Sequence, residues 1–321
     1  MAVTRKVVIL GTGGTIAGIG HAQGGGLGYQ AGQIEVAQLL TPLLQGGSMA
    51  GVALEAEQVA QLDSKDMDVS TWRKLAAARR RWLSKEEVAA LVITHGTDTL
   101  EETAWFLQCV LQPHKPVVMT CAMRPATALS ADGPGNLRDA LAAAVQSAAG
   151  VWVVAAGEMH SAQWVRKVHP YRVHAFASAA YGPAGWIEEG RLRWASGHAQ
   201  SMQLATLALE SAVQRIAEDA WPWVEVVCSA AAARPQVVDA LVAAGVQGLV
   251  VAATGNGSVH QALLPVLQRA QDQGVVVWRT TKCEQGHIVQ ADGVQDPAVS
   301  ELSPAKARIS LMLQLLERSA G

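Results

Sequence analysis

Apolar strands and helical segments alternate along most of the chain. Runs of β-branched and aliphatic residues end at glycines or small polar residues and are followed by segments with helical periodicity. The pattern predicts buried strands over residues 7–10, 52–61, 89–93, 116–121, 151–156, 224–228, 248–253 and 275–279. It predicts helices over residues 34–44, 70–84, 101–111, 137–148, 235–244, 259–273 and 304–318. Such alternation is typical of an α/β fold with mainly parallel sheets flanked by helices.

The alternation weakens between residues 196 and 222 and then restarts. A chain of 321 residues also exceeds the usual size of one domain. We therefore expect a large N-terminal domain over residues 1–196, a connector over 197–221 and a smaller C-terminal α/β domain over 222–321. Each of the two domains is expected to contain its own mainly parallel sheet.

Composition favours a packed globular protein with a small-molecule partner. Half of the residues are hydrophobic, 16% are charged and the formal net charge is -2, which offers no attraction to nucleic acid or anionic lipid. No stretch approaches the roughly 20 apolar residues that span a bilayer. The apolar run over residues 7–10 is too short for the core of a signal peptide. We therefore predict a cytoplasmic protein that binds neither nucleic acid nor membrane.

Cysteine usage gives no sign of a metal or redox site. The four cysteines lack C-x-x-C spacing and lie in or beside apolar segments, so we expect buried free thiols at Cys109, Cys121, Cys228 and Cys283. No cluster of His, Cys and carboxylate residues has the spacing of metal ligands. The sequence predicts chemistry without a metal or other cofactor.

The first predicted strand runs into a glycine-rich loop, GTGGTIAG, at residues 11–18. Its spacing departs from the G-x-G-x-x-G dinucleotide motif, and the Lys-Ser/Thr pair of a P-loop does not follow, so a nucleotide site is disfavoured. Two threonines, Thr12 and Thr15, stand among the glycines at the carboxyl end of the strand, where ligands bind in open α/β sheets. Either hydroxyl could serve as a nucleophile, and spacing alone does not choose between them.

The next segment, residues 19–33, is rich in glycine and is a candidate lid over a site. Its single aromatic residue, Tyr29, is either a surface residue or a partner in chemistry. A threonine hydroxyl needs a base to remove its proton, and Tyr29 is one candidate. Lys167 is another, because burial beside a cation such as Arg166 would favour its neutral form.

Further polar residues fall at predicted strand ends, which share one edge of a parallel sheet. They are Ser64, Asp66, Thr94, His95, Thr97, Asp98 and Asn256. Asp98 could hold a lysine in its charged form or receive a substrate ammonium, whereas His95 could act as a base or only tie its loop by hydrogen bonds. Threonines and aspartates in such places also cap helices, so a structural role stays open for each.

Several of these segments together resemble the bacterial L-asparaginase family of amidohydrolases. GTGGTIAG at residues 11–18 resembles its first signature, and ITHGTDTLEETA at 93–104 resembles its second. Supporting matches are DSKDM at 63–67, AMRP at 122–125, SADGP at 130–134, YGP at 181–183 and LSPAKAR at 302–308. The resemblance extends over essentially the whole chain and implies hydrolysis of L-asparagine to L-aspartate and ammonia.

The resemblance also implies roles for individual residues. Thr15 would be the nucleophile that forms an acyl-enzyme, with Tyr29 as its partner on the lid. Thr97, Asp98 and Lys167 resemble the second threonine of the family with its aspartate and lysine. The resemblance thus selects Thr15 over Thr12.

Substrate contacts and assembly follow from the same resemblance. Ser64 would hold the α-carboxylate of the substrate and Asp98 its α-ammonium. The family implies a homotetramer with sites shared between subunits, in which Ser258 approaches a neighbouring subunit's site. Glu284 is a candidate for an acidic group that the second domain brings to the substrate.

The sequence departs from the family pattern at Lys65, which stands where many members have a glutamine next to the substrate's amino group. A cation there would repel the substrate ammonium unless it points away or pairs with an acid. Two alternatives therefore remain: a glutaminase-asparaginase or other small-amide amidase, and a non-catalytic amino-acid sensor on the same scaffold.

Overall fold

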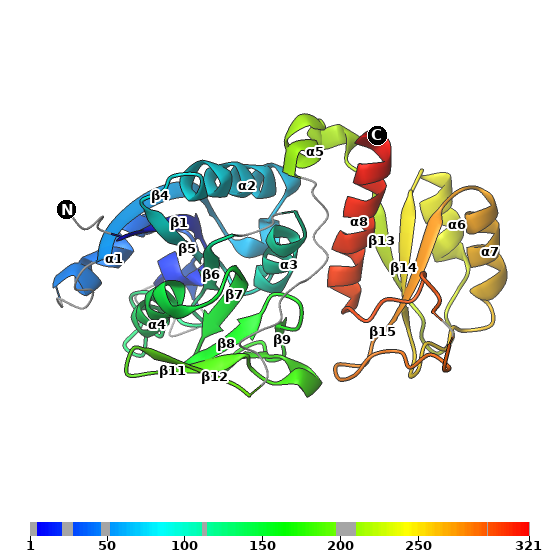
Figure 1. The fold of residues 1–321 in the computed structure, drawn as a ribbon. Helices are drawn as coiled ribbons and strands as arrows, with labels where there is room; N and C mark the ends of the chain where they lie inside the picture. The colour runs from blue at the N-terminus through cyan, green and yellow to red at the C-terminus, as the bar shows by residue number, and fades with distance from the viewer. Residues whose placement is uncertain are drawn as a thin grey trace. The chain divides into compact units, whose positions relative to one another are not determined.

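A computed structural model of the chain describes residues 5–20, 28–45, 52–110, 114–196, 210–293 and 295–320. It divides the chain into two compact units, Met1–Ala208 and Leu209–Gly321, which are described separately below (Figure 1). The division falls within the segment for which the sequence predicts a connector. Of that segment, residues 197–209 lie outside the described residues, and α5 (Glu210–Arg215) belongs to the second unit.

The first unit is built on an eight-stranded sheet with the order β12-β11-β8-β7-β6-β5-β1-β4. The strands at one end of this order pair in parallel, and those at the other end pair antiparallel. The parallel strands are β4 (Val52–Leu62), β1 (Arg5–Gly13), β5 (Val88–Thr94), β6 (Pro116–Thr120) and β7 (Gly150–Ala155). The antiparallel extension is β8 (Glu158–Ser161), β11 (Gly185–Glu188) and β12 (Arg191–Trp194).

Helices cover both faces of this sheet (Figure 1). On one face lie α1 (Val36–Gln45) and α4 (Gly133–Gln146), and on the other lie α2 (Val69–Leu83) and α3 (Leu100–Val110). Because both faces are covered, successive residues of a central strand are buried alike, as in β1, where Val8 and Ile9 have no exposed surface. This double cover explains why the central strands are continuous apolar runs in the sequence.

The second unit contains a smaller parallel sheet of β13 (Val224–Cys228), β14 (Gly248–Ala253) and β15 (Val276–Thr281). Side chains of α6 (Gln236–Ala243) and α7 (Leu264–Asp272) form a core with one face of the sheet. The long helix α8 (Pro304–Ala320) also packs on the strands of this sheet. Two mainly parallel sheets flanked by helices confirm the predicted fold class.

Several expectations about local structure are wrong. The antiparallel strands β8, β11 and β12 were not predicted, because each has only four residues and includes polar or charged ones, although β8 is mostly buried. The helix expected from residue 137 begins at Gly133, and the one expected from residue 259 begins only at Leu264. Both errors concern loops whose glycine or proline residues lie inside or next to a first helical turn.

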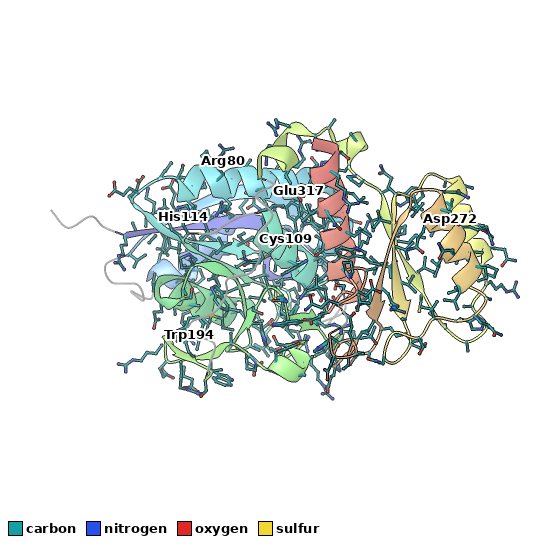
Figure 2. The ribbon with its side chains drawn as sticks, turned by 45° about the vertical axis from the view of Figure 1, so that its right-hand side comes forward. Arg80, Cys109, His114, Trp194, Asp272 and Glu317 are labelled. Carbon is teal, nitrogen blue, oxygen red and sulfur yellow. The ribbon has the colours of Figure 1, made fainter. Side chains whose placement is uncertain are left out.

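The cysteines divide into two pairs, which corrects the expectation of four buried thiols. Cys109 and Cys121 are buried, whereas Cys228 and Cys283 are exposed, and none of the four forms a disulfide. Figure 2 shows Cys109 among interior side chains, while Arg80 on α2 projects outward. Burial raises the pKa of the Cys121 thiol far above its ordinary value. An inert packing role follows for Cys121.

Candidate active site

Thr15 lies directly after β1, at the start of a single 3₁₀ turn over Thr15–Ala17. Its side chain is almost buried, and its Oγ1 is 2.7 Å from the phenolic oxygen of Tyr29. The hydroxyl of Thr12 has a different partner, because it donates to the backbone carbonyl of Thr94 at 2.9 Å. Of the two loop threonines, Thr15 therefore directs its hydroxyl toward another side chain, whereas Thr12 bonds to the backbone.

Tyr29 is held by a short antiparallel ribbon in which β2 (Ile19–Gly20) pairs with β3 (Tyr29–Gln30). The absence of a side chain at Gly18 makes room for its ring, since a Cβ there would lie 3.0 Å from Tyr29 Cδ2. The lid expected over residues 19–33 is thus described at its two ends, and residues 21–27 lie outside the described residues. The ribbon fixes the phenol beside Thr15.

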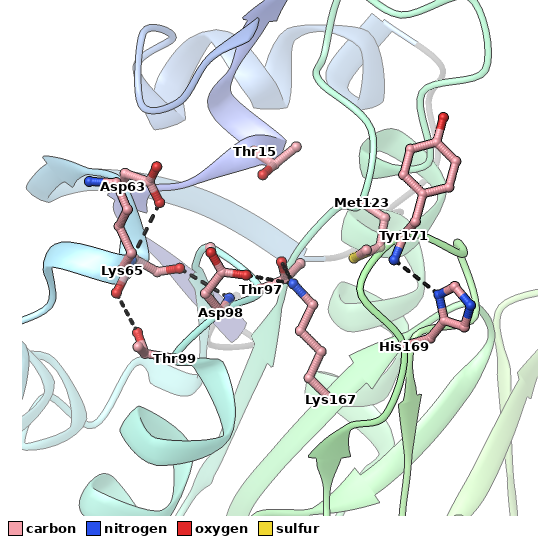
Figure 3. Close-up of polar contacts among 12 residues, drawn as sticks. Thr15, Asp63, Lys65, Thr97, Asp98, Thr99, Met123, Lys167, His169 and Tyr171 are labelled. Atoms are coloured by element: carbon pink, nitrogen blue, oxygen red, sulfur yellow. Dashed lines mark hydrogen bonds and ion pairs between the residues drawn. The ribbon is translucent and has the colours of Figure 1, made fainter. Parts of the chain in front are cut away.

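A second set of side chains meets at the end of β5. The Lys167 ammonium, from the short strand β9 (Arg166–Lys167), donates to Thr97 Oγ1 at 2.8 Å and pairs with Asp98 Oδ1 at 2.5 Å (Figure 3). The Lys167 side chain is 16% exposed and that of Asp98 is 53% exposed. Asp98 is thus paired with Lys167, as one of its two predicted roles requires, and its contact with a substrate ammonium stays a prediction.

Ser64 lies at the start of the 3₁₀ turn Ser64–Asp66, which follows β4, and it contacts the loop that carries Thr97 and Asp98. Its Oγ accepts a hydrogen bond from the backbone N–H of Asp98 at 3.2 Å, and its carbonyl accepts one from the Thr99 hydroxyl at 2.7 Å. Ser64 is almost fully buried. The loop with Thr97 and Asp98 is thus tied to the end of β4.

Lys65 pairs with the carboxylate of Asp66, and both side chains are largely exposed. The hydrogen bond to Asp66 raises the pKa of Lys65 most, and the charges of Asp66, Asp63 and Asp98 raise it further. The ion-pair partner of Lys65 is therefore Asp66, and the charge of Asp98 has only the smallest effect on the Lys65 pKa. We expect a lysine here to repel the substrate ammonium unless it pairs with an acid, and Lys65 is paired with Asp66.

Glycines bring the three loops together. A Cβ on Gly14 would collide with the backbone of Gly96, and a Cβ on Gly96 would collide with the Ser64 side chain. Gly14 also has a φ of 78°, in the left-handed region that favours glycine. The loops of Thr15, Thr97 and Ser64 can touch only because glycine stands at both contacts, which a phosphate-binding interpretation of the motif does not explain.

His95 stabilises the loop that carries Thr97 through a hydrogen bond to the backbone. It has no exposed surface, and its Nδ1 lies 2.7 Å from the carbonyl oxygen of Gly96. Burial lowers its pKa from 6.5 to about 4, while the hydrogen bond to Gly96 opposes that shift. A buried imidazole with so low a pKa is a weak base, and its Nδ1 is occupied by the bond to Gly96, so loop tying is favoured over general-base chemistry.

A polar network that the sequence did not predict holds the ribbon carrying Lys167. In that ribbon β9 pairs with β10 (Phe176–Ala177). Glu158 on β8 accepts from His174 at 3.0 Å, and the buried His160 lies 2.9 Å from the Ser178 hydroxyl, just after β10. The only signal in the sequence is the cluster of basic residues over 162–174, which gives no indication of these partners.

Ser258 is in the second unit, in the loop that follows β14. Its carbonyl accepts hydrogen bonds from the backbone N–H and the hydroxyl of Thr254, at 2.9 and 2.8 Å. The side chains that the first unit brings together therefore do not include Ser258. Its predicted approach to a neighbouring subunit's site stays a prediction.

Two surveys bear on other classes of function. Within the described ranges, no group of three or more His, Cys, Asp or Glu side chains is arranged to hold a metal ion. Among the helices of those same ranges, none is long and apolar enough to cross a membrane.

Comparison with known proteins identifies the family. Residues 6–200 match the family model described as Asparaginase, N-terminal, and residues 223–319 match the Glutaminase/Asparaginase C-terminal domain. The chain is 36% identical to a glutaminase-asparaginase of Acinetobacter glutaminasificans, with 97% of this chain and 95% of that protein covered. It is 35% identical to L-asparaginase 2 of Escherichia coli, with 97% and 89% covered.

A solved structure agrees with these matches. The crystal structure of a probable cytoplasmic L-asparaginase from Campylobacter jejuni superposes with a TM-score of 0.84 at 33% identity, covering 97% of this chain and 95% of that one. The fold and the matches over both units define an amidohydrolase. Within that class, the chain belongs to the bacterial L-asparaginase family.

Proposed function

We propose that this protein is an L-asparaginase that hydrolyses the side-chain amide of L-asparagine to L-aspartate and ammonia through an acyl-enzyme on Thr15. The observation that carries the proposal is the 2.7 Å contact between Thr15 Oγ1 and the Tyr29 hydroxyl, beside the cluster in which Lys167 contacts Thr97 and Asp98. Family membership supports the reaction class. No cofactor enters the proposed chemistry.

In the first step, Thr15 Oγ1 attacks the amide carbon while its proton passes to the Tyr29 oxygen, 2.7 Å away, and Tyr29 gives its own phenolic proton to the amide nitrogen. The C–N bond then breaks, and the nitrogen leaves as ammonia. The substrate acyl group remains on Thr15 as an ester. In the second step, water attacks this ester, aspartate is released and the Thr15 hydroxyl is restored.

Thr97 and Lys167 supply electrostatic stabilisation in this scheme. The Lys167 ammonium donates to Thr97 Oγ1, which strengthens that hydroxyl as a donor to an oxygen on which negative charge develops. Asp98 holds the ammonium in place and keeps its second carboxylate oxygen for the substrate ammonium. Ser64 offers its hydroxyl to the α-carboxylate, and Lys65 lies at the edge of this binding set.

Substrate range stays open between two amides. Relatives at similar identity are named L-asparaginase and glutaminase-asparaginase. Discrimination against one extra methylene is worth only about 1–3 kcal/mol, so small changes in the lid can shift the preference. We propose asparagine as the main substrate and glutamine as the alternative.

We further propose a homotetramer in which Ser258 approaches the site of a neighbouring subunit, as the family resemblance implies. A cytoplasmic location is part of the same proposal. A solved relative is described as a probable cytoplasmic enzyme, whereas a 35% identical protein of Haemophilus influenzae is named a probable periplasmic L-asparaginase. Sedimentation of the purified protein tests the oligomeric state.

An ammonia-release assay on L-asparagine and L-glutamine, run side by side, tests the proposed function. We expect ammonia from both, with the higher kcat/KM for asparagine. A higher kcat/KM for glutamine would make the protein a glutaminase-asparaginase. Binding of asparagine without any ammonia would contradict the proposal and favour the amino-acid sensor.

A further inference from the structure

The second unit contains a cavity of about 310 Å³ between helix α7 and strand β15, lined by residues of this unit alone and by none of the residues that the proposed amidase chemistry uses. Its inner wall is apolar, because Val251 of β14 and Leu267 of α7 are buried there and Val277 of β15 is partly buried. Leu264, at the first turn of α7, is 53% exposed and forms part of the rim. This volume is at the lower end of the range for ligand pockets, so it suits a small metabolite.

Opposite charges face each other in the lining of the same cavity. The Arg279 guanidinium and the Asp296 carboxylate are 3.8 Å apart, which is longer than a hydrogen bond. Their side chains are 41% and 43% exposed. Arg279 makes one further long contact, from Nη1 to the Gly257 carbonyl at 3.4 Å. Both charged groups therefore retain donors or acceptors for a ligand.

The charge pair selects among classes of ligand. A simple anion on Arg279 would be repelled by Asp296, and a simple cation on Asp296 would be repelled by Arg279. An uncharged apolar ligand would pack against the apolar wall but would offer no partner to Arg279 or Asp296. A zwitterion matches both groups at once, since its anionic and cationic ends can each meet the opposite charge.

We propose that this cavity binds an α-amino acid with an aliphatic side chain. The ligand carboxylate is placed on Arg279, its ammonium on Asp296, and its side chain against Val251, Leu267 and Val277. The site lies entirely within the second unit and uses none of the amidase residues. It stands or falls independently of the proposed function.

Calorimetric titration of the purified protein with L-leucine tests the proposal. We expect one saturable site per chain. The matched ligands are 4-methylpentanoate, which lacks the ammonium, and 3-methylbutylamine, which lacks the carboxylate. Each should bind at least about tenfold more weakly, because the acid has no ammonium to pair with Asp296 and the amine has no carboxylate to pair with Arg279.

Variants then locate the binding. Asp296→Asn keeps the side-chain volume and should weaken leucine binding at least about tenfold. Leu264→Lys, at the exposed rim, should also weaken it, with little risk to the fold. Arg234→Met, which changes an exposed arginine of the same unit that does not line the cavity, is the control and should bind leucine as the unchanged protein does.

Three results would overturn the inference. One is no saturable heat up to about 10 mM leucine, where a ligand with a Kd of about 1 mM would be mostly bound. Another is equal affinity for leucine, the acid and the amine. The third is loss of leucine binding in Asp98→Asn together with full binding in Asp296→Asn, which would place the ligand in the first unit instead.

Discussion

The two units share threonines that donate to backbone carbonyls, such as Thr12 and Thr99 in the first unit, but two threonines of the first unit have side-chain partners instead. In the first unit, the hydroxyls of Thr15 and Thr97 contact the side chains of Tyr29 and Lys167. In the second unit, the strand-end and loop threonines donate to backbone carbonyls of Ser258, Leu302 and Gly255; these donors are Thr254, Thr280 and Thr281. A hydroxyl that donates to a carbonyl stabilises a loop, whereas the hydroxyls beside the phenol and the ammonium are those to which the proposed chemistry gives a part. The partner of the hydroxyl, rather than its place on the sheet, separates chemistry from structure.

The largest expected effect is the difference in activity between two threonine variants, one for each kind of hydroxyl partner. Thr15→Val should lower kcat/KM for asparagine by at least about 10³-fold, because the nucleophilic oxygen is removed. Thr280→Val should leave kcat/KM within about twofold and cost about 1 kcal/mol of the free energy of unfolding, the typical net value of one hydrogen bond. Ammonia release and chemical denaturation measure the two effects. Equal losses of activity in both variants would remove the distinction between the units.

A similar pair exists among the lysines of the first unit. Lys167 contacts side chains, whereas the Lys115 ammonium donates to the carbonyls of Leu83 and Lys85. Lys167→Met should reduce kcat by about 10²–10³-fold with little change in KM, since it removes stabilisation of the transition state. Lys115→Met should affect the free energy of unfolding and leave kcat unchanged. Steady-state kinetics decide this, and a raised KM alone for Lys167→Met would argue for a binding role.

The buried imidazole under the Thr97 loop gives a pH prediction. His95 has an ordinary pKa of 6.5 that falls to about 4 in the folded chain, so below pH 6.5 the unfolded state takes up a proton that the folded state does not. The free energy of unfolding should therefore fall as pH drops from 6.5 to 4, by about 3 kcal/mol from this group.

Denaturation of the unchanged protein and of His95→Asn across that pH range measures this contribution. Other titrating groups act on both proteins, so the difference between the two curves isolates His95. A parallel pair of curves would show that the folded imidazole titrates normally.

The smallest effect is expected at Lys65. Lys65→Gln should lower KM for asparagine by about two- to fivefold with kcat unchanged, because an exposed and paired cation exerts only a screened repulsion on the substrate ammonium. Lys74→Gln, an exposed lysine on α2, is the control. An increase in KM for Lys65→Gln would mean that Lys65 attracts the substrate, and its place in the binding set would need a different explanation.

Most of the fold could be predicted because both faces of the parallel strands are buried. Such strands are continuous apolar runs, and the prediction for residues 248–253 coincides with β14. The antiparallel strands lack that signal, because more buried residues alternate with more exposed ones, as in β11 and β12. Tertiary contacts also decide burial in places where composition suggests solvent, and Arg79, in a run of three arginines, is only 4% exposed.

The site could be predicted in part for a similar reason. Carboxyl ends of parallel strands share an edge, so Ser64, Thr97 and Thr15 could be expected near one another. The hydrogen-bond partners could not be predicted, since the choice between Thr12 and Thr15 depends on a carbonyl of Thr94 that is distant in sequence. The network of Glu158 and His160 arises from the unpredicted strand β8 and was therefore missed entirely.

The central claim is that amide hydrolysis passes through an ester of Thr15, and the partition of that ester between water and hydroxylamine tests it most directly. L-Asparagine and the β-methyl ester of L-aspartate would give the same acyl-enzyme. In the presence of hydroxylamine, both should therefore yield aspartyl hydroxamate and aspartate in the same ratio, and Thr15→Val should form neither product at an appreciable rate. Different ratios from the two substrates, or hydroxamate formation by Thr15→Val at the rate of the unchanged protein, would contradict the account.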